Sequence, residues 1–290
     1  MAVVWRAEAI LAQGFRRAVA IKRIEPTLRG SPEVIAMFVE EARVGSLLRH
    51  PNIVTVLDFG VDEGGDYYLV TELVEGLHLG NWVNAHAMSK TETPWELVAA
   101  IGMEILRALD AAHGRLDHSG KPSPVLHRDV TPPNILLDEL GVVKLADFGL
   151  ARAMDRGRMT QANVVKGKVS YLAPELVQGH SPSVQSDLFG VGIVLWEALT
   201  MQRLFAAEND VAAALLVRDA RVPLIGMKRP NVPLTLARVV HRALERDPGR
   251  RFASAGEMLE ALRELLRVLP VTTDATRLRD SVKNAMARLR

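Results

Sequence analysis

The stretch HRDVTPPNILLDELGVVKLADFG, residues 127–149, decides the fold. Two apolar runs, ILL and VVKLA, flank a Gly-containing turn, and this pattern predicts a β-hairpin. A hairpin brings the start of its first strand and the end of its second strand to one edge, so we expect Asn134, Asp147 and Asp129 to converge there. Oxygen-bearing side chains of this kind can hold a hard cation and accept a proton. Asp and Asn are also common turn formers, so convergence alone leaves a purely structural reading open.

Composition excludes several classes of protein. The 290 residues are 48% hydrophobic and 24% charged, a globular composition long enough for one large or two modest domains. A net charge of +2 gives no reason to expect a nucleic-acid partner, and the lack of cysteine excludes disulfides and thiolate metal sites. The most apolar run, residues 188–199, contains Glu197 and is too short to cross a bilayer. No secretory leader pattern follows the first methionine, so we expect a cytoplasmic protein with no membrane span.

The segment Ala18–Ile24, AVAIKRI, predicts a strand. Lys22 shares a face of this strand with Ala18 and Ala20, whose small side chains leave room for a flat ligand. Taken alone, this strand favours the alternative, an edge-strand lysine that faces water.

A helix follows, beginning at Ser31-Pro32-Glu33 and running to about Arg49. Glu41 lies in the middle of its apolar stripe, which comprises Val34, Met37, Phe38, Val44 and Leu48. A buried, unpaired carboxylate would cost several kcal/mol, so Glu41 needs a cation, and Lys22 is the best candidate. The alternative is an acid at the edge of the stripe that reaches solvent.

Residues 52–59 and 67–73 predict two further strands, which with the lysine strand form a small antiparallel sheet carrying one helix. Long helical periodicity begins after Gly76 and, apart from the hairpin and a basic loop beyond it, continues to Leu269. This change predicts three segments: residues 1–73, residues 74–269, and a basic C-terminal tail at 270–290. The amphipathic tail could contact a membrane surface or partner, pack on its own domain, or link to another.

The ordered motifs resemble those of the protein kinase superfamily, most closely the bacterial eukaryotic-type (Hanks-type) Ser/Thr kinases. The resemblance covers residues 1 to about 267 and rests on VAIK ending at Lys22, Glu41, HPNIV (50–54), HRDVTPPN (127–134), DFG (147–149), APE (173–175), SDLFGVG from Ser186, and Arg251. It implies an α+β, bilobal protein-kinase-like fold. The small N-lobe would be an antiparallel β-sheet with one long helix, and the larger C-lobe would be mainly helical.

The resemblance also implies roles for the catalytic residues. Lys22 would hold the α/β-phosphates of ATP and pair with Glu41. Asn134 and Asp147 would bind Mg²⁺, and Asp129 would accept or orient the proton of the substrate hydroxyl.

Further residues would form the nucleotide slot. Val4 and Ala20 would line the adenine, and Glu72 and Val74 would offer backbone hydrogen bonds to the base. Thr71 would guard the pocket behind it.

Other matched residues would be structural or regulatory. Glu175 and Arg251 would form an ion pair, and Asp187 would brace the catalytic loop through backbone amides. Arg128 would pair with a phosphate on the activation segment, with Thr160 as the favoured phosphorylation site. An unmodified Thr160 remains the alternative.

Three features depart from the family pattern. The first strand of the N-lobe and the Gly-rich loop that should cover the phosphates would both lie before the first methionine, so the natural chain is either longer or truncated. Thr131 stands where Ser/Thr kinases usually carry a lysine, which removes a positive charge near the transferring phosphate. Lys168 stands where a threonine usually helps to hold the catalytic loop.

The resulting hypothesis is an ATP- and Mg²⁺-dependent kinase that acts on Ser/Thr hydroxyls of protein substrates, including its own activation segment. The pattern leaves open a homodimer for trans-autophosphorylation. The alternative is a truncated pseudokinase that serves as a binding or scaffold module. Retention of Lys22, Glu41, Asp129, Asn134 and Asp147 favours the enzyme.

Overall fold

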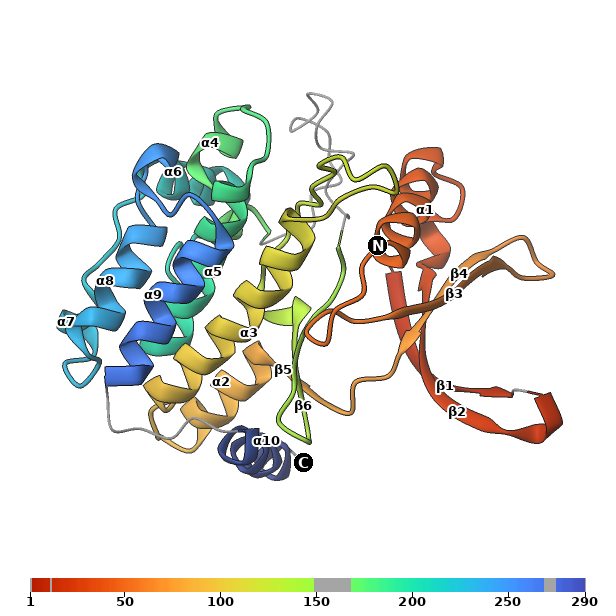
Figure 1. The fold of residues 1–290 in the computed structure, drawn as a ribbon, viewed down its shortest axis with the longest axis horizontal. Helices are drawn as coiled ribbons and strands as arrows, with labels where there is room; N and C mark the ends of the chain where they lie inside the picture. Colours follow the sequence, from red (N-terminus) through yellow and green to blue (C-terminus); the bar gives the residue numbers. More distant parts are fainter. Residues whose placement is uncertain (1, 11, 149–167, 269–274, 290) are drawn as a thin grey trace.

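The computed structural model describes residues 2–10, 12–148, 168–268 and 275–289, and within them a β-rich lobe lies beside a helical lobe (Figure 1). The β-rich lobe holds a four-stranded antiparallel sheet in the order β1-β2-β4-β3. Its strands are β1 (Ala2–Ile10), β2 (Arg16–Ile24), β3 (Val56–Val61) and β4 (Tyr67–Glu72). The predicted small antiparallel sheet is therefore present.

Strand β1 was not predicted from the sequence. It is an edge strand, paired only with β2 among the described strands, and most of its side chains are exposed on both faces. Its sequence begins with a run of mostly exposed apolar residues, and only residues 5–9, WRAEA, alternate between apolar and polar, with alanine at two of the apolar positions, so the period-two signal is weak.

Helix α1 (Pro32–Ser46) packs on this sheet (Figure 1). Its start is fixed as expected, because the Ser31 Oγ accepts a hydrogen bond from Val34 N (3.4 Å) and proline occupies the first turn. The helix ends at Ser46, slightly before the predicted end near Arg49. Its buried face joins the sheet in a separate small core, made of Ile24, Val34, Phe38, Ala42 and Leu69.

The predicted hairpin is confirmed as β6 (Ile135–Asp138) and β7 (Val143–Leu145), with β5 (Gly76–His78) beside β6 in a second sheet of order β5-β6-β7. Gly76 is required here, because a Cβ at this position would lie 2.0 Å from the Leu137 carbonyl oxygen. Residues 73–75 connect the two sheets.

The helical lobe is organised around α5 (Val184–Thr200), which is buried along nearly its whole length. Helix α3 (Trp95–His113) contacts both α5 and α9 (Ala255–Val268), and Figure 1 shows α3 beside α9. The remaining helices are α2 (Leu79–Met88), α4 (Pro174–Val177), α6 (Asp210–Asp219), α7 (Ile225–Lys228) and α8 (Leu234–Ala243). None of the helices in the described ranges is long and apolar enough to span a membrane.

Helix α10 (Ala275–Leu289) contains the amphipathic part of the basic tail and packs on its own domain, against α2 and β5 (Figure 1). Leu278, Val282 and Ala285 form its buried stripe. The Trp82 indole N–H donates to Ser281 Oγ over 3.0 Å. Of the three alternatives for the tail, packing on the same domain is the one observed.

Candidate active site

Lys22 and Glu41 meet between the sheet and helix α1. Lys22 Nζ lies 2.6 Å from Glu41 Oε1, and the two residues are 9% and 3% exposed. The ion pair expected from the buried position of Glu41 is present, and neither of the solvent-facing alternatives holds.

Asp147, at the end of the hairpin, is the third member of this cluster. Its Oδ1 lies 2.9 Å from Lys22 Nζ, so one ammonium group faces two carboxylates. Burial raises the pKa of Glu41 to about 7, against the favourable charge of Lys22. Burial acts against ionisation of Asp147 as well, but the charge of Lys22 holds the pKa of this carboxyl below its usual range. When Glu41 is ionised, the cluster carries an excess of negative charge, which favours a bound cation.

Asp129 and Asn134 lie together in the loop that precedes the hairpin. The Asn134 amide nitrogen donates to the backbone oxygen of Asp129 (2.9 Å) and to its Oδ2 (3.0 Å). A third side chain, Lys168, places Nζ 2.5 Å from the same Oδ2. Asp129 is thus held in one orientation while remaining 9% exposed.

Asp187 braces this loop, as expected. Its Oδ2 accepts from His127 N (2.8 Å), and its Oδ1 accepts from Arg128 N (2.7 Å). Asp187 lies in the first turn of α5, whose start is fixed by a reciprocal pair of hydrogen bonds between Ser183 and Ser186. These contacts hold Arg128 at φ 67°, a left-handed conformation that costs free energy in a non-glycine residue.

His127 joins the catalytic loop to the hairpin, a role that the sequence analysis did not assign to it. Its ring accepts from Asp129 N at Nδ1 (3.2 Å) and donates from Nε2 to the Ala146 oxygen (2.9 Å). Burial lowers the pKa of His127, which keeps the ring in the neutral form that this pattern requires. Asp147, which follows Ala146, has φ 62°, and Arg128, which follows His127, has φ 67°. Strained backbone therefore occurs beside both residues that the hydrogen bond from His127 to Ala146 joins.

The residues present fit a magnesium ion that is shared with a phosphate ligand. The Asn134 amide nitrogen is turned to Asp129, so its amide oxygen is the atom left to coordinate a metal, and Asp147 adds a carboxylate. Mg²⁺ prefers oxygen ligands and is commonly bound by one or two carboxylates together with substrate phosphates. Within the described ranges, no group of three or more His, Asp or Glu side chains forms a metal cage of protein ligands alone.

The residues expected at the adenine slot share one face of the sheet. Val4 lies directly opposite Lys22, and Ala20 lies opposite Thr71, so their side chains are on the same side. The Glu72 N–H already donates to the Thr55 oxygen (3.0 Å), so a base would have to use the Glu72 carbonyl oxygen. Val74 follows in the connector between the two sheets.

The expected regulatory contact would join Arg128 to a phosphorylated Thr160. Thr160 and Gly149 lie outside the described residues. Arg128 is part of the braced loop. Ser170, a second hydroxyl residue between the DFG and APE motifs, donates to the Phe205 oxygen (3.0 Å), so it has a structural contact of its own.

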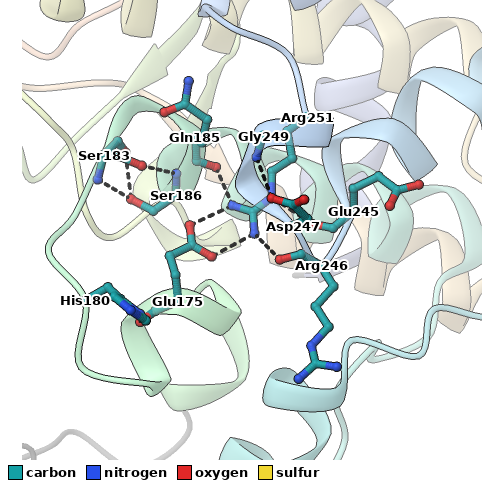
Figure 2. A network of polar contacts seen from close by, with 10 residues as sticks. All are labelled: Glu175, His180, Ser183, Gln185, Ser186, Glu245, Arg246, Asp247, Gly249 and Arg251. Carbon is teal, nitrogen blue, oxygen red and sulfur yellow. Dashed lines mark hydrogen bonds and ion pairs between the residues drawn. The ribbon is translucent and has the colours of Figure 1, made fainter.

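The predicted ion pair of the helical lobe joins Glu175 to Arg251 (Figure 2). Two guanidinium nitrogens donate to the two carboxylate oxygens, each over 2.7 Å, and the Arg251 side chain is fully buried. Arg251 also donates to three backbone oxygens, those of Gln185, Glu245 and Arg246. This network ties the segment around α4 to the loop before α9.

Comparison with known proteins gives a consistent result. Residues 8–262 match the family described as the protein kinase domain. The tyrosine-protein kinase MasK of Myxococcus xanthus is 36% identical over 268 residues, which cover 92% of this chain and 41% of that protein. The probable serine/threonine-protein kinase PknB of Lactococcus lactis is 36% identical over 243 residues, covering 84% of this chain and 37% of that protein.

A solved structure supports the fold assignment. The PknI kinase domain of Mycobacterium tuberculosis aligns with a TM-score of 0.65 at 26% identity, covering 91% of this chain and 90% of that one. The bilobal α+β fold is thereby shown. The chain spans about two fifths of the length of these two curated relatives.

Proposed function

Because this chain belongs to the protein kinase family, we propose that it transfers the γ-phosphate of ATP to Ser/Thr hydroxyls of protein substrates. One observation carries the proposal. The structure brings two acid-containing groups to the same region between the lobes: Lys22 with Glu41 and Asp147, and Asp129 with Asn134. His127 hydrogen-bonds both Asp129 N and the oxygen of Ala146, the residue before Asp147, and so connects the second group to the first.

Lys22 would position the α/β-phosphates of ATP. A lysine that forms two ion pairs in a buried site has little rotamer freedom, so its ammonium group is oriented before the nucleotide binds. Glu41 keeps the lysine in place, and Asp147 links it to the metal-binding side of the site. Bound Mg²⁺, held by Asn134 and Asp147, would neutralise the charge that develops on the phosphates.

Asp129 would accept or orient the proton of the attacking hydroxyl. Phosphoryl transfer depends mostly on positioning and electrostatics, so the main task of this carboxylate is to align the oxygen with the phosphorus. The hydrogen bonds from Asn134 use the backbone oxygen and Oδ2 of Asp129. The remaining oxygen, Oδ1, is the one we assign to the substrate.

The nucleotide base would occupy the face of the sheet that carries Val4 and Ala20, with backbone contacts from Glu72 and Val74. We propose that residues 1–73 form the N-lobe, residues 74–269 the C-lobe, and residues 270–290 a basic C-terminal tail. The pairing of Val4 with Lys22 and of Ala20 with Thr71 supports the proposed site for the base, because it puts these side chains on one face of the sheet.

For regulation, we retain phosphorylation of Thr160 with Arg128 as its partner, and trans-autophosphorylation in a homodimer, as parts of the proposal. We also propose a cytoplasmic location and protein rather than nucleic-acid substrates. The low net charge of +2 supports the last point.

The identity of the phosphorylated residue tests the proposal. The purified chain is incubated with Mg²⁺, γ-labelled ATP and a general protein substrate, followed by phosphoamino-acid analysis. We expect label in phosphoserine and phosphothreonine, loss of label in Asp147→Asn, and retention in Asp219→Asn, which alters an exposed aspartate at the end of α6. Label in phosphotyrosine alone would overturn the Ser/Thr assignment, a relevant outcome since one relative is named a tyrosine-protein kinase. ATP binding without transfer would support the pseudokinase alternative.

A further inference from the structure

The contact between Lys168 and Asp129 joins two sequence departures that the family resemblance left separate. Lys168 Nζ lies 2.5 Å from Asp129 Oδ2, although the residues are 39 positions apart in the chain. Thr131, which lies two residues after Asp129 in the catalytic loop, is neutral and buried. A cation is therefore present beside Asp129, but it comes from the segment before α4 and not from the catalytic loop.

The backbone that carries Lys168 is fastened to the helical lobe. A short 3-10 turn, Val169–Tyr171, begins directly after it, and Tyr171 N donates to the Lys168 oxygen (3.1 Å). The Tyr171 hydroxyl donates to Glu197 Oε2 (2.7 Å), and the Ser170 hydroxyl donates to the Phe205 oxygen (3.0 Å). The lysine is thus mounted on a supported turn, which places its charge reproducibly.

The exposure of the two partners indicates an open site. The Lys168 side chain is 41% exposed, whereas that of Asp129 is 9% exposed. The contacts from Lys168 and Asn134 to the Asp129 carboxylate both fall on Oδ2, so the pair does not use Oδ1, the oxygen assigned to the substrate hydroxyl. An ammonium group carries three N–H donors, so the bond to Asp129 does not exhaust its capacity to donate.

We propose that Lys168 supplies the catalytic cation that the loop His127–Asn134 lacks. Resting on the proposed kinase function, this assignment gives Lys168 two tasks: contacting the γ-phosphate during transfer and holding Asp129 against the acceptor hydroxyl. Charge spreads over the three equatorial oxygens of the transferring group, and a cation fixed beside them stabilises the transition state. Relative to the family pattern, the lysine and the threonine would then have exchanged places: the lysine stands at position 168 and the threonine at position 131, on two sides of one site.

Four variants test this assignment. Lys168→Thr removes the charge, Lys168→Arg keeps it, and the double variant Thr131→Lys with Lys168→Thr moves it to the catalytic loop. Lys228→Thr makes the same substitution at an exposed position in α7, at the far end of the helical lobe (Figure 1). Two experiments are done on each: steady-state kinetics give kcat and KM for phosphoryl transfer, and calorimetry in the presence of Mg²⁺ gives the ratio of ATP to ADP affinity.

We expect Lys168→Thr to lower kcat by about 10- to 100-fold, less than the loss of a fully buried donor because Lys168 is partly exposed. The preference for ATP over ADP should fall in the same variant, since only ATP carries the γ-phosphate. Lys168→Arg should retain most of the activity, and the double variant should recover most of the loss. Lys228→Thr should match the wild type.

Three results would overturn the assignment. The first is an unchanged kcat together with an unchanged ATP/ADP affinity ratio in Lys168→Thr. It would mean that Lys168 neither contacts the γ-phosphate nor positions Asp129. A raised kcat would mean that Lys168 blocks Asp129. Lost activity that the double variant does not restore would indicate a structural brace. If the wild type binds ATP but transfers nothing, the proposed function fails, and the ATP/ADP ratio still decides whether Lys168 contacts the γ-phosphate.

Discussion

Substitution of Arg251 by methionine should destabilise the helical lobe far more than the same substitution at its neighbour Arg250. The Arg251 side chain is fully buried and forms a two-point ion pair with Glu175, whose side chain is 10% exposed. The Arg250 side chain is 72% exposed, and its guanidinium lies 3.9 Å from Glu245. The two positions therefore offer a matched comparison within one loop (Figure 2 shows the Arg251 network).

The expected magnitude follows from what methionine leaves behind. Removing one partner of a buried ion pair costs about 3–5 kcal/mol, because the other charge stays buried without compensation. Here three backbone oxygens, of Gln185, Glu245 and Arg246, also lose a charged donor. We therefore expect Arg251→Met to lower the free energy of unfolding by about 4 kcal/mol. Arg250→Met should change it by about 0–1 kcal/mol, as is usual for exposed pairs.

Urea unfolding followed by tryptophan fluorescence measures this difference, since Trp82 and Trp196 are buried in the helical lobe. The double variant Glu175→Gln with Arg251→Met completes a double-mutant cycle, and the two substitutions should be strongly non-additive. A free energy for Arg251→Met within about 1 kcal/mol of that for Arg250→Met would refute the reasoning. So would additive effects of the two substitutions.

Two further predictions concern other buried groups. Burial raises the pKa of Glu197 from 4.5 to about 7, so its protonated form favours the folded state, and its contribution is full below about pH 4.5 and lost as pH rises through about 7. The free energy of unfolding of Glu197→Gln, measured with urea, should therefore rise relative to that of the wild type as pH increases from 5 to 8, by up to about 3 kcal/mol. A difference between variant and wild type that is the same at pH 5 and pH 8 would contradict this prediction. Val282→Asp should release α10, because an unpaired carboxylate in its buried stripe costs several kcal/mol, and hydrogen exchange should rise in α10 but not in α3. Asn284→Asp, at an exposed position of α10, is the control. Equal rates of hydrogen exchange in α10 for the two variants would contradict the packing of α10 on the domain.

The sequence predicted those parts of the site in which local pattern and burial point the same way. The hairpin followed from two apolar runs around a glycine turn, and the pairing of Lys22 with Glu41 followed from the cost of burying an acid in an apolar stripe. The resemblance to the protein kinases, based on the order of the motifs, then predicted the helical lobe. These inferences depend on short-range periodicity or on one strong electrostatic constraint.

What the sequence did not predict depends on long-range contacts or on surfaces without a pattern. Strand β1 buries neither face fully, and its alternation is limited to residues 5–9, so its period-two signal is weak. The contact of Lys168 with Asp129 joins two loops whose relative position is set by the packing of the whole lobe. The bridge from His127 to the Ala146 oxygen involves a backbone group, which carries no sequence signal.

The rate of γ-phosphate transfer in Asp129→Asn tests the central claim most directly. Asparagine keeps the shape of the side chain but cannot accept the proton of the hydroxyl, so we expect the rate at saturating Mg²⁺ and ATP to fall by about 100-fold or more. The affinity for ATP should stay within about threefold of wild type, since Asp129 is assigned to the acceptor and not to the nucleotide. Equal transfer rates in the wild type and Asp129→Asn would contradict the account of this site.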